Sequence, residues 1–438
     1  MKRTKSLPLL ALLLLISAAF TLKTDPKPSL KEKVLELSEA VESKVIDWRH
    51  HIHENPELSN REFKTAALVA AHLKSLGMEV QENVAKTGVV GILKGGKPGP
   101  TIGLRADMDA LPVKERVQLP WASKAKGEYL GEEVPVMHAC GHDTHVSILM
   151  GVAEVLSQVK KDLRGTVKFI FQPAEEGAPP GEEGGAALMV KEGVIENMDV
   201  IFGLHISSDI EVKNIAYRTG GMMASANSFT VKIYGKQSHG SKPWGGVDPI
   251  VTAAQIINNA QTIISRNSEL TKQAAVLTFG KMTGGVRSNI IPEYAELVGT
   301  IRTLDPDMQK VIFERFKTVV EHTGASNGAK AELIIDEGYP ITFNDPDLTK
   351  LMTPTFMEVG GADFVNTEIE ATTGAEDFSF FANEIPGLYF RLGGMPEGTE
   401  KADAAPHHTP DFYVDDAGLL LGIKTMSRLV VDYAELKK

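Results

Sequence analysis

The chain has 438 residues, of which 42% are hydrophobic and 24% are charged, a composition typical of a globular protein with two or three domains. Acidic residues outnumber basic ones by 57 to 46, and the resulting net charge of -11 argues against a nucleic-acid-binding protein. A single cysteine, Cys140, excludes an internal disulfide and a four-cysteine zinc finger.

Residues 1–22 are predicted to be a secretory signal peptide. Lys2, Arg3 and Lys5 give a positive start, and the apolar run at 7–20 that follows is short for a transmembrane helix. We therefore expect an exported protein, periplasmic or secreted, without membrane contact once the signal is removed. The alternative interpretation is an uncleaved membrane anchor.

Residues 29–219 are predicted to form the first part of a catalytic α/β domain. Two helices at 29–55 and 62–76 precede a region in which apolar strands alternate with helical stretches. The strands are expected at 88–93, 101–104, 166–171 and 200–204, and the helices near 142–159 and 184–192. This alternation favours a mainly parallel sheet, in which reactive side chains gather at the carboxyl ends of the strands.

Residues 220–338 show a different order of elements, which indicates an inserted domain. Strands are expected at 228–234, 274–281, 294–303 and 329–336, and helices at 248–265 and 306–323. The order β-α-β-β-α-β is that of a ferredoxin-like sandwich. Residues 339–438 return to the α/β pattern and are predicted to complete the catalytic domain, with a strand near 387–392 and a final helix near 416–435.

Three histidines and the only cysteine gather in residues 138–145. Thiolate and imidazole are preferred ligands of zinc and similar metals, and Cys140 and His142 can point the same way in an extended segment. The stretch therefore predicts a metal-ligand loop. One alternative is a histidine-rich turn that caps the next helix, and another is a Cys140 nucleophile activated by His142 or His145.

Other polar side chains follow the predicted strands of the α/β domain. Glu175 and Glu176 are adjacent carboxylates after an apolar strand, where a metal would supply the compensating charge. One could bind the metal while the other holds a water as general base. Asp107 and His205 also come just after strands, and a carboxylate such as Asp107 could orient a ligand histidine. Each of these residues alone also fits a structural or surface role.

The predicted insert and the C-terminal region carry further polar motifs. His239 lies in a loop that contains glycine and proline, Asn289 follows the sequence Gly-Gly-Val-Arg-Ser, and Arg302 ends a predicted strand. Near the C-terminus, His407 and His408 precede a Thr-Pro pair. Alone, these motifs fit loop hydrogen bonding and surface charge.

Taken together, these motifs resemble the N-acyl-amino-acid amidohydrolase family, which includes hippurate hydrolases and indoleacetyl-amino-acid hydrolases and belongs to the two-metal peptidases. The resemblance covers about residues 35–435. The matching stretches are His53-x-x-Pro-Glu57-Leu58, Leu104-Arg-Ala-Asp-Met-Asp-Ala-Leu-Pro112, His138-Ala-Cys-Gly-His-Asp143, Phe171-Gln-Pro-Ala-Glu-Glu176, Gly203-Leu-His205, His239 with Pro243-Trp-Gly-Gly-Val-Asp-Pro249, Arg287-Ser-Asn-Ile-Ile-Pro292, Gly299-Thr-Ile-Arg302, Gly374-Ala-Glu-Asp-Phe378 and His408-Thr-Pro410. Their joint occurrence in this order is specific, although no single stretch would decide it.

The resemblance implies a two-metal centre. The residues similar to the family's ligands of two divalent ions, which could be zinc, manganese or cobalt, are Cys140, His142, Glu176, His205 and His408. His408 is preferred to His407 because the family's ligand directly precedes the small-residue–proline pair. Glu175 looks like the general base, and Asp107 looks like a supporting carboxylate.

The resemblance also gives roles to the insert. Asn289 and Arg302 look like holders of the substrate carboxylate. His239 looks like a residue that reaches the active site of a partner subunit, which implies a homodimer formed through the insert. Gln237-Ser238 and the long loop at 177–185 depart from the family pattern, so the acyl preference stays open.

The implied activity is metal-dependent hydrolysis of the amide bond of N-acyl-amino acids. Glu175 would take a proton from metal-activated water, and His239 would stabilise the oxyanion. A dipeptidase or carboxypeptidase on the same scaffold is the main alternative, because the sequence does not spell out the substrate pocket. A silent binding module is a further alternative, but it would be expected to lack a ligand, whereas the implied set is complete.

Overall fold

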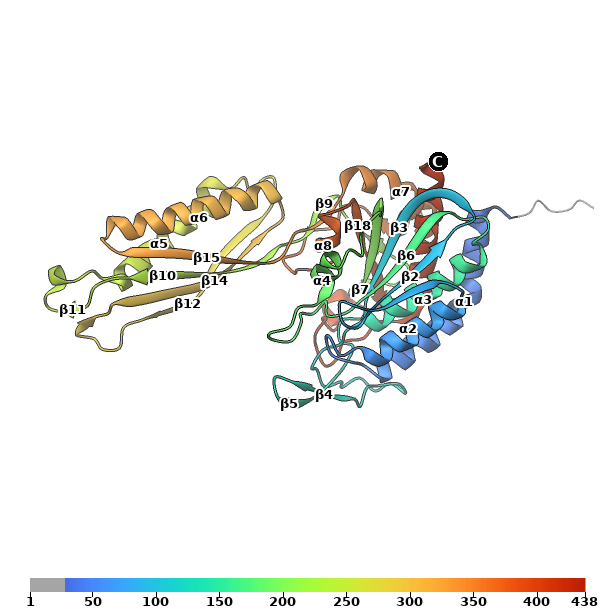
Figure 1. Cartoon of the computed structure of the whole chain (residues 1–438), viewed down its shortest axis with the longest axis horizontal. Helices are drawn as coiled ribbons and strands as arrows, with labels where there is room; N and C mark the ends of the chain where they lie inside the picture. The colour runs from blue at the N-terminus through green and yellow to red at the C-terminus, as the bar shows by residue number, and fades with distance from the viewer. Residues whose placement is uncertain (1–27, 438) are drawn as a thin grey trace, which may run out of the picture.

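The computed structural model describes residues 28–437, so the predicted signal peptide lies outside the described residues. Within them, no helix combines the length and the apolar character needed to cross a membrane. Two large sheets, each with its own hydrophobic core, lie side by side along the long axis of the molecule (Figure 1).

The larger sheet has eight strands and a parallel centre. Its strands, in spatial order, are β1 (Glu79–Val84), β2 (Gly88–Lys94), β6 (Arg164–Gln172), β3 (Lys97–Asp107), β7 (Val200–Glu211), β18 (Gly387–Met395), β8 (Ile215–Ala216) and β17 (Val365–Asn366). The neighbours β6, β3, β7 and β18 run parallel. The predicted mainly parallel α/β fold is confirmed, and the carboxyl ends of these four strands meet at one edge.

Helices cover both faces of this sheet. The main core lies under α1 (Leu30–Glu54), α2 (Phe63–Ser75), α3 (His142–Gln158), α7 (Pro346–Gly360) and α9 (Leu419–Leu436), and a smaller one lies under α4 (Gly185–Lys191) and α8 (Ser379–Ala382). α1 starts with a capping box, because the Ser29 hydroxyl accepts from the Glu32 amide while the Glu32 carboxylate accepts from Ser29. Its buried residues Val34, Val41 and Val45 recur on one helical face.

The smaller sheet is antiparallel and has four strands. In spatial order these are β12 (Ala275–Gly284), β14 (Tyr294–Thr303), β10 (Ala226–Tyr234) and β15 (Lys330–Tyr339), and the covering helices are α5 (Pro249–Thr262) and α6 (Pro306–Ser326). Both helices begin with an aspartate cap followed by proline, which fixes their first turns. The predicted β-α-β-β-α-β order is confirmed.

Short strand pairs complete the fold. β9 (Gly220–Met223) pairs with β16 (Thr342–Asn344) where the chain passes from one large sheet to the other and back. β11 (Ser238–His239) pairs with β13 (Ile290–Ile291) at the tip of the smaller sheet, far from the larger one (Figure 1). β4 (Lys126–Tyr129) and β5 (Glu132–Pro135) form a hairpin.

Two strands run longer than the sequence indicated. β3 ends at Asp107 and β7 continues to Glu211, so Asp107 and His205 belong to strands, whereas we expected them to follow strands. The reason is pairing with neighbouring strands. β18 continues to pair with β7 beyond His205, and β6 pairs with β3 as far as Asp107. Both side chains still lie toward the carboxyl edge of the sheet.

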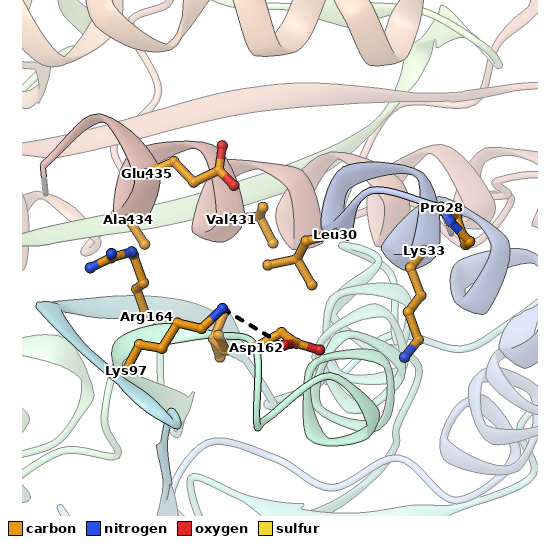
Figure 2. A pocket seen from close by; sticks show the side chains of 10 residues that line it. Pro28, Leu30, Lys33, Lys97, Asp162, Arg164, Val431, Ala434 and Glu435 are labelled. Atoms are coloured by element: carbon orange, nitrogen blue, oxygen red, sulfur yellow. Dashed lines mark ion pairs between the residues drawn. The ribbon is translucent and has the colours of Figure 1, made fainter. Parts of the chain in front are cut away.

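The pocket drawn in Figure 2 lies at the opposite edge of this sheet. Its walls include Lys97 and Arg164, the first residues of β3 and β6, together with Leu30 of α1 and Val431 of α9. None of the predicted site residues lines it. The chemistry predicted from the sequence therefore belongs to the carboxyl edge and not to this pocket.

Candidate metal centre

Cys140 and His142 lie on either side of a tight glycine turn. Gly141 has a φ of 94°, and a Cβ there would lie 2.4 Å from the side chain of Ile206, so the position requires glycine. The extended segment that we expected is wrong, because α3 begins directly at His142. Cys140, His142 and His205 nevertheless each offer a ligand atom, and these atoms lie within 4.8 Å of one another.

Two buried histidines turn one ring nitrogen toward this group. Nδ1 of His142 donates to the backbone carbonyl of Asp109 (2.8 Å), and Nδ1 of His205 donates to that of Ile206 (2.5 Å). Nε2 of His205 lies 3.4 Å from the sulfur of Cys140. Nε2 of His142 is buried and has no hydrogen-bond partner among the described residues. A buried, unpartnered imidazole nitrogen beside a thiol fits a metal ligand whose orientation is fixed from behind.

A second ligand group shares the same cysteine. Nε2 of His408 lies 3.3 Å from the Cys140 sulfur and 3.0 Å from Oε1 of Glu176, and all three ligand atoms lie within 4.8 Å. His407 does not take this place, because its Nδ1 faces the carbonyl of Cys140 and its Nε2 accepts from the Ser208 amide. Two groups of thiolate, imidazole and carboxylate ligands that share Cys140 fit a pair of divalent ions.

Protons occupy part of this cluster when no cation is bound. Burial raises the pKa of the Cys140 thiol, and the nearby Glu176 carboxylate raises it further. Hydrogen bonds to Cys140 and to Glu176 raise the pKa of His408 to about 10. A raised thiol pKa is the opposite of what a cysteine nucleophile needs, so it argues against Cys140 as the nucleophile.

The two buried histidines differ in charge. Burial lowers the pKa of His142, but the charge of Asp107 and the hydrogen bond to Asp109 hold this pKa well above its ordinary value. Burial and then the charge of Arg391 hold the pKa of His205 well below its ordinary value. His205 is therefore neutral, whereas a cation must displace a proton from His142.

Glu175 lies beside both ligand groups. Its Oε2 is 3.8 Å from Nε2 of His142, and the side chain of Asp109 accepts hydrogen bonds from the Glu175 and Glu176 amides, at 3.0 Å each. Burial raises the pKa of Glu175 well above its ordinary value, and the charge of Glu376 adds to the rise. A buried carboxyl group of this kind can both accept and return a proton.

Asp107 supports His145, which is not among the proposed metal ligands. Its Oδ1 accepts from Nδ1 of His145 (2.5 Å) and its Oδ2 from Arg105 (2.6 Å), whereas Nδ1 of His142 lies 3.8 Å away. The second nitrogen of His145 accepts from the amide of Ile206 (2.9 Å). Both ring nitrogens of His145 are thus engaged, so it has no lone pair with which to activate Cys140.

Several carboxylates of the site received no role from the sequence. Asp109 holds the Glu175–Glu176 turn, and Glu376 and Asp377 place their oxygens within 4.8 Å of Glu175 while pairing with Arg105 at 2.9 and 2.8 Å. Two features of the sequence could have identified them. Asp109 lies two residues after Asp107, and Glu376 and Asp377 lie in the family-like stretch 374–378.

The three predicted residues of the insert lie elsewhere in the single chain. His239 is exposed on β11, and its neighbour Gly240 donates to the carbonyl of Asn289 (2.8 Å), so these two loops meet at the tip of the smaller sheet (Figure 1). Arg302 is half-buried in β14 and donates to Thr300. None of the three contacts the Cys140 cluster, and their contact with substrate stays a prediction.

Residues 103–432 match the model of the peptidase family M20/M25/M40. The chain belongs to this family. Thermostable carboxypeptidase 2 of Saccharolobus solfataricus is 40% identical over 407 residues, which cover 92% of this chain and 99% of that relative. N-acetyl-L-cysteine deacetylase of Bacillus subtilis is 36% identical over 380 residues, which cover 87% of this chain and 86% of that relative.

A solved structure agrees with this assignment. The crystal structure of a Bacillus subtilis dinuclear metal binding peptidase from the M20 family matches with a TM-score of 0.75 and 33% identity, covering 91% of this chain and 99% of that one. The predicted family resemblance is confirmed. The chain is a hydrolase of the M20/M25/M40 family, and the ligand groups around Cys140 fit two metal ions.

Proposed function

We propose that this M20 chain hydrolyses the amide bond of N-acyl-amino acids, with two divalent metal ions as cofactors. The proposed ligands are Cys140, His142, Glu176, His205 and His408. The observation that carries the proposal is that two ligand groups share Cys140 directly beside the buried carboxyl group of Glu175. The deacetylase among the relatives supports an acylated amino acid as the substrate.

The reaction adds water across the amide and breaks its C–N bond, giving a carboxylic acid and a free amino acid. Divalent ions held by these ligands would supply Lewis acidity, which polarises an amide carbonyl and lowers the pKa of water. Glu175 takes a proton from the attacking water and returns it to the leaving nitrogen. Its burial suits the second step, because the raised pKa of Glu175 lets the side chain hold the proton between the two transfers.

The insert supplies the remaining proposed contacts. The amide and the hydroxyl of Ser241 both lie at Nδ1 of His239, at 3.1 and 2.8 Å. Because the amide can only donate, Nδ1 accepts and Nε2 carries the proton, which suits a donor to the developing oxyanion. We assign Asn289 and Arg302 to the substrate carboxylate, and we place His239 in the active site of a partner subunit in a homodimer.

A carboxypeptidase is the second candidate function. The observation that favours it is the 40% identity to a thermostable carboxypeptidase, which exceeds the identity to the deacetylase. Both activities break an amide bond next to a carboxylate-bearing residue, so the cluster around Cys140 and Glu175 serves either. What differs is the group on the acyl side of the bond.

The test is amino-acid release from a matched panel of N-acyl-amino acids and dipeptides. We expect release that a chelator abolishes and that added zinc, manganese or cobalt restores, with acylated substrates preferred. Preference for peptides would move the assignment to the carboxypeptidase. Release that persists after complete metal removal would contradict the metal-dependent mechanism.

We also propose that the protein is exported, on the strength of the positive start and the apolar run at 7–20. Fractionation of cells that express the full chain and a variant lacking residues 7–20 tests this. Equal retention of both in the cytoplasm would contradict export.

A further inference from the structure

Three side chains hold the turn that carries Glu175. The Ala174 amide donates to Glu62 (2.9 Å), the Glu175 amide donates to Asp109 (3.0 Å), and the Glu175 carbonyl accepts from the hydroxyl of Tyr339 (2.6 Å). Ala174 has a φ of 53°, which is strained for a residue with a Cβ. The turn therefore keeps its shape because its surroundings impose it.

Tyr339 differs from the other two partners in its origin. Glu62 directly precedes α2 and Asp109 follows β3, so both belong to the body around the larger sheet. Tyr339 is the last residue of β15 and pairs with Ala226 of β10, so it belongs to the smaller sheet. Its hydroxyl thus joins a strand of one sheet to the turn at the edge of the other.

The ring of Tyr339 is packed against the larger domain where the chain passes between the two sheets. It packs edge-on against Phe380 of α8, with ring centroids 6.0 Å apart and an angle of 77° between the planes. Held in this way, the hydroxyl meets the Glu175 carbonyl without much freedom. A shift of β15 must then either move the Glu175 turn or break this hydrogen bond.

We infer that Tyr339 is a positioning residue for Glu175, and that its hydroxyl links the placement of the base to that of the smaller sheet. The inference rests on the proposed function, in which Glu175 is the base and the smaller sheet of the same chain holds the substrate carboxylate through Arg302, near the end of β14. A substrate held at both places needs the two sheets in one relative position. The Tyr339 hydrogen bond ties the reacting carboxyl group to that position.

The variant Tyr339→Phe tests this, because it keeps the ring on Phe380 and removes only the hydroxyl. We expect kcat to fall by about 10- to 100-fold, with KM changed less than about threefold and the metal content unchanged. In a Glu175→Ala background the same change should alter the residual rate by less than about twofold, because the group it positions is gone. Equal losses of rate in both backgrounds would overturn the inference.

A second measurement does not depend on activity. Hydrogen exchange of a peptide spanning residues 171–178 should become about tenfold faster in Tyr339→Phe. The matched control is Tyr217→Phe, which removes a hydroxyl that donates to Thr353 (3.1 Å) far along the chain from this turn, and its exchange there should equal that of the wild type. Unchanged exchange in Tyr339→Phe would overturn the inference. A wild type that cleaves no acylated amino acid would instead refute the proposed function, and the exchange result would still decide the role of Tyr339.

Discussion

At the scale of single residues, the chemistry centres on the sulfur of Cys140. It lies 3.4 Å from Nε2 of His205 and 3.3 Å from Nε2 of His408, within a buried group of ligand atoms. Burial keeps the thiol protonated, so the side chain is a poor nucleophile by itself. A divalent cation reverses this, because it stabilises the thiolate directly.

Metal affinity should therefore fall as the pH falls. Cation binding displaces protons from Cys140, His142 and His408, whose pKa values all stand above their ordinary values in the metal-free chain. Since more than one proton leaves, we expect the apparent affinity to weaken by at least about tenfold for each pH unit below about 8. Competition with a chromophoric chelator measures this. The Cys140→Ser variant should show a shallower slope, and an affinity independent of pH would contradict the assignment.

The Glu175→Ala variant should keep its metal and lose its turnover. General-base catalysis is worth about 100- to 10,000-fold, and Glu175 is the proposed base but not a proposed ligand. Metal content by mass spectrometry and kcat on the best substrate of the panel measure the two effects. Glu182→Gln is a nearby control. Glu182 lies in the loop that follows Glu175 and pairs with Arg61, so the loss of its charge should leave kcat near normal. Near-normal turnover in Glu175→Ala would show that another group is the base.

At the scale of elements, buried charges join α1 to the start of α3. Arg49 and His53 of α1 lie 3.2 and 3.0 Å from the carboxylate of Asp143, the residue after His142. Burial lowers the pKa of His53, but Asp143 outweighs it and raises this pKa to about 9. The turn that presents His142 is therefore fixed by an ionic contact between helices as well as by the apolar core.

The Asp143→Asn variant should lower the free energy of unfolding by about 3 kcal/mol, because Arg49 and His53 lose the buried carboxylate that they share and keep only Asp416 and Glu115, respectively, as acidic partners. Glu154→Gln is the matched control on the same helix. Glu154 pairs with exposed Lys44 of α1, and its loss should cost less than about 1 kcal/mol. Chemical denaturation measures the free energy of unfolding of both variants. Equal losses of stability would contradict a stabilising role for the buried contact of Asp143 with Arg49 and His53.

The contribution of the His53–Asp143 ion pair to stability depends on pH in a definite direction. The pKa of His53 is about 9 in the folded chain and about 6.5 in the unfolded one. Its contribution to stability is therefore complete below about pH 6.5 and is lost as the pH rises through about 9. The stability difference between wild type and Asp143→Asn should shrink over the same range.

At the scale of the whole molecule, the proposed site is divided between two sheets. The proposed metal ligands lie at the carboxyl edge of the larger sheet, whereas His239 lies at the distant tip of the smaller one (Figure 1). The proposal resolves this separation through a homodimer, in which the tip of one chain reaches the cluster of the other. A complementation experiment decides whether His239 acts in its own chain or in the partner.

Glu175→Ala and His239→Ala should each be nearly inactive alone and should regain activity when the subunits are mixed. Random exchange makes half of the dimers mixed, and one of the two sites in each then has both intact residues. The recovered rate should be about a quarter of the wild-type rate. Recovery should be absent when Glu175→Ala is mixed with Cys140→Ala, since both changes lie in the same cluster. If the first mixture also stays inactive, His239 does not act across subunits.

The sequence by itself determined the family, the order of the elements and the groups of residues that meet at the metal centre. Apolar periodicity predicts helices and strands locally, as in α1 and β6. The side chains of Cys140, His142 and Glu176 are of the types that bind metal ions, so they can be recognised from the sequence. The parallel strands then had to bring their carboxyl ends together, because alternation of strands and helices allows few other arrangements.

Only the tertiary structure decided which of these groups touch. It gave Asp107 to His145, which is not among the proposed ligands, and it joined Tyr339 to the carbonyl of Glu175 across 164 residues of chain, whereas the family resemblance had already indicated His408 over His407. Such choices depend on small differences in the distances between side chains that are remote in sequence, because a hydrogen bond forms only within a narrow range of distance. Periodicity and residue type report on neighbours along the chain, so they cannot fix contacts that arise from packing one sheet against the end of another.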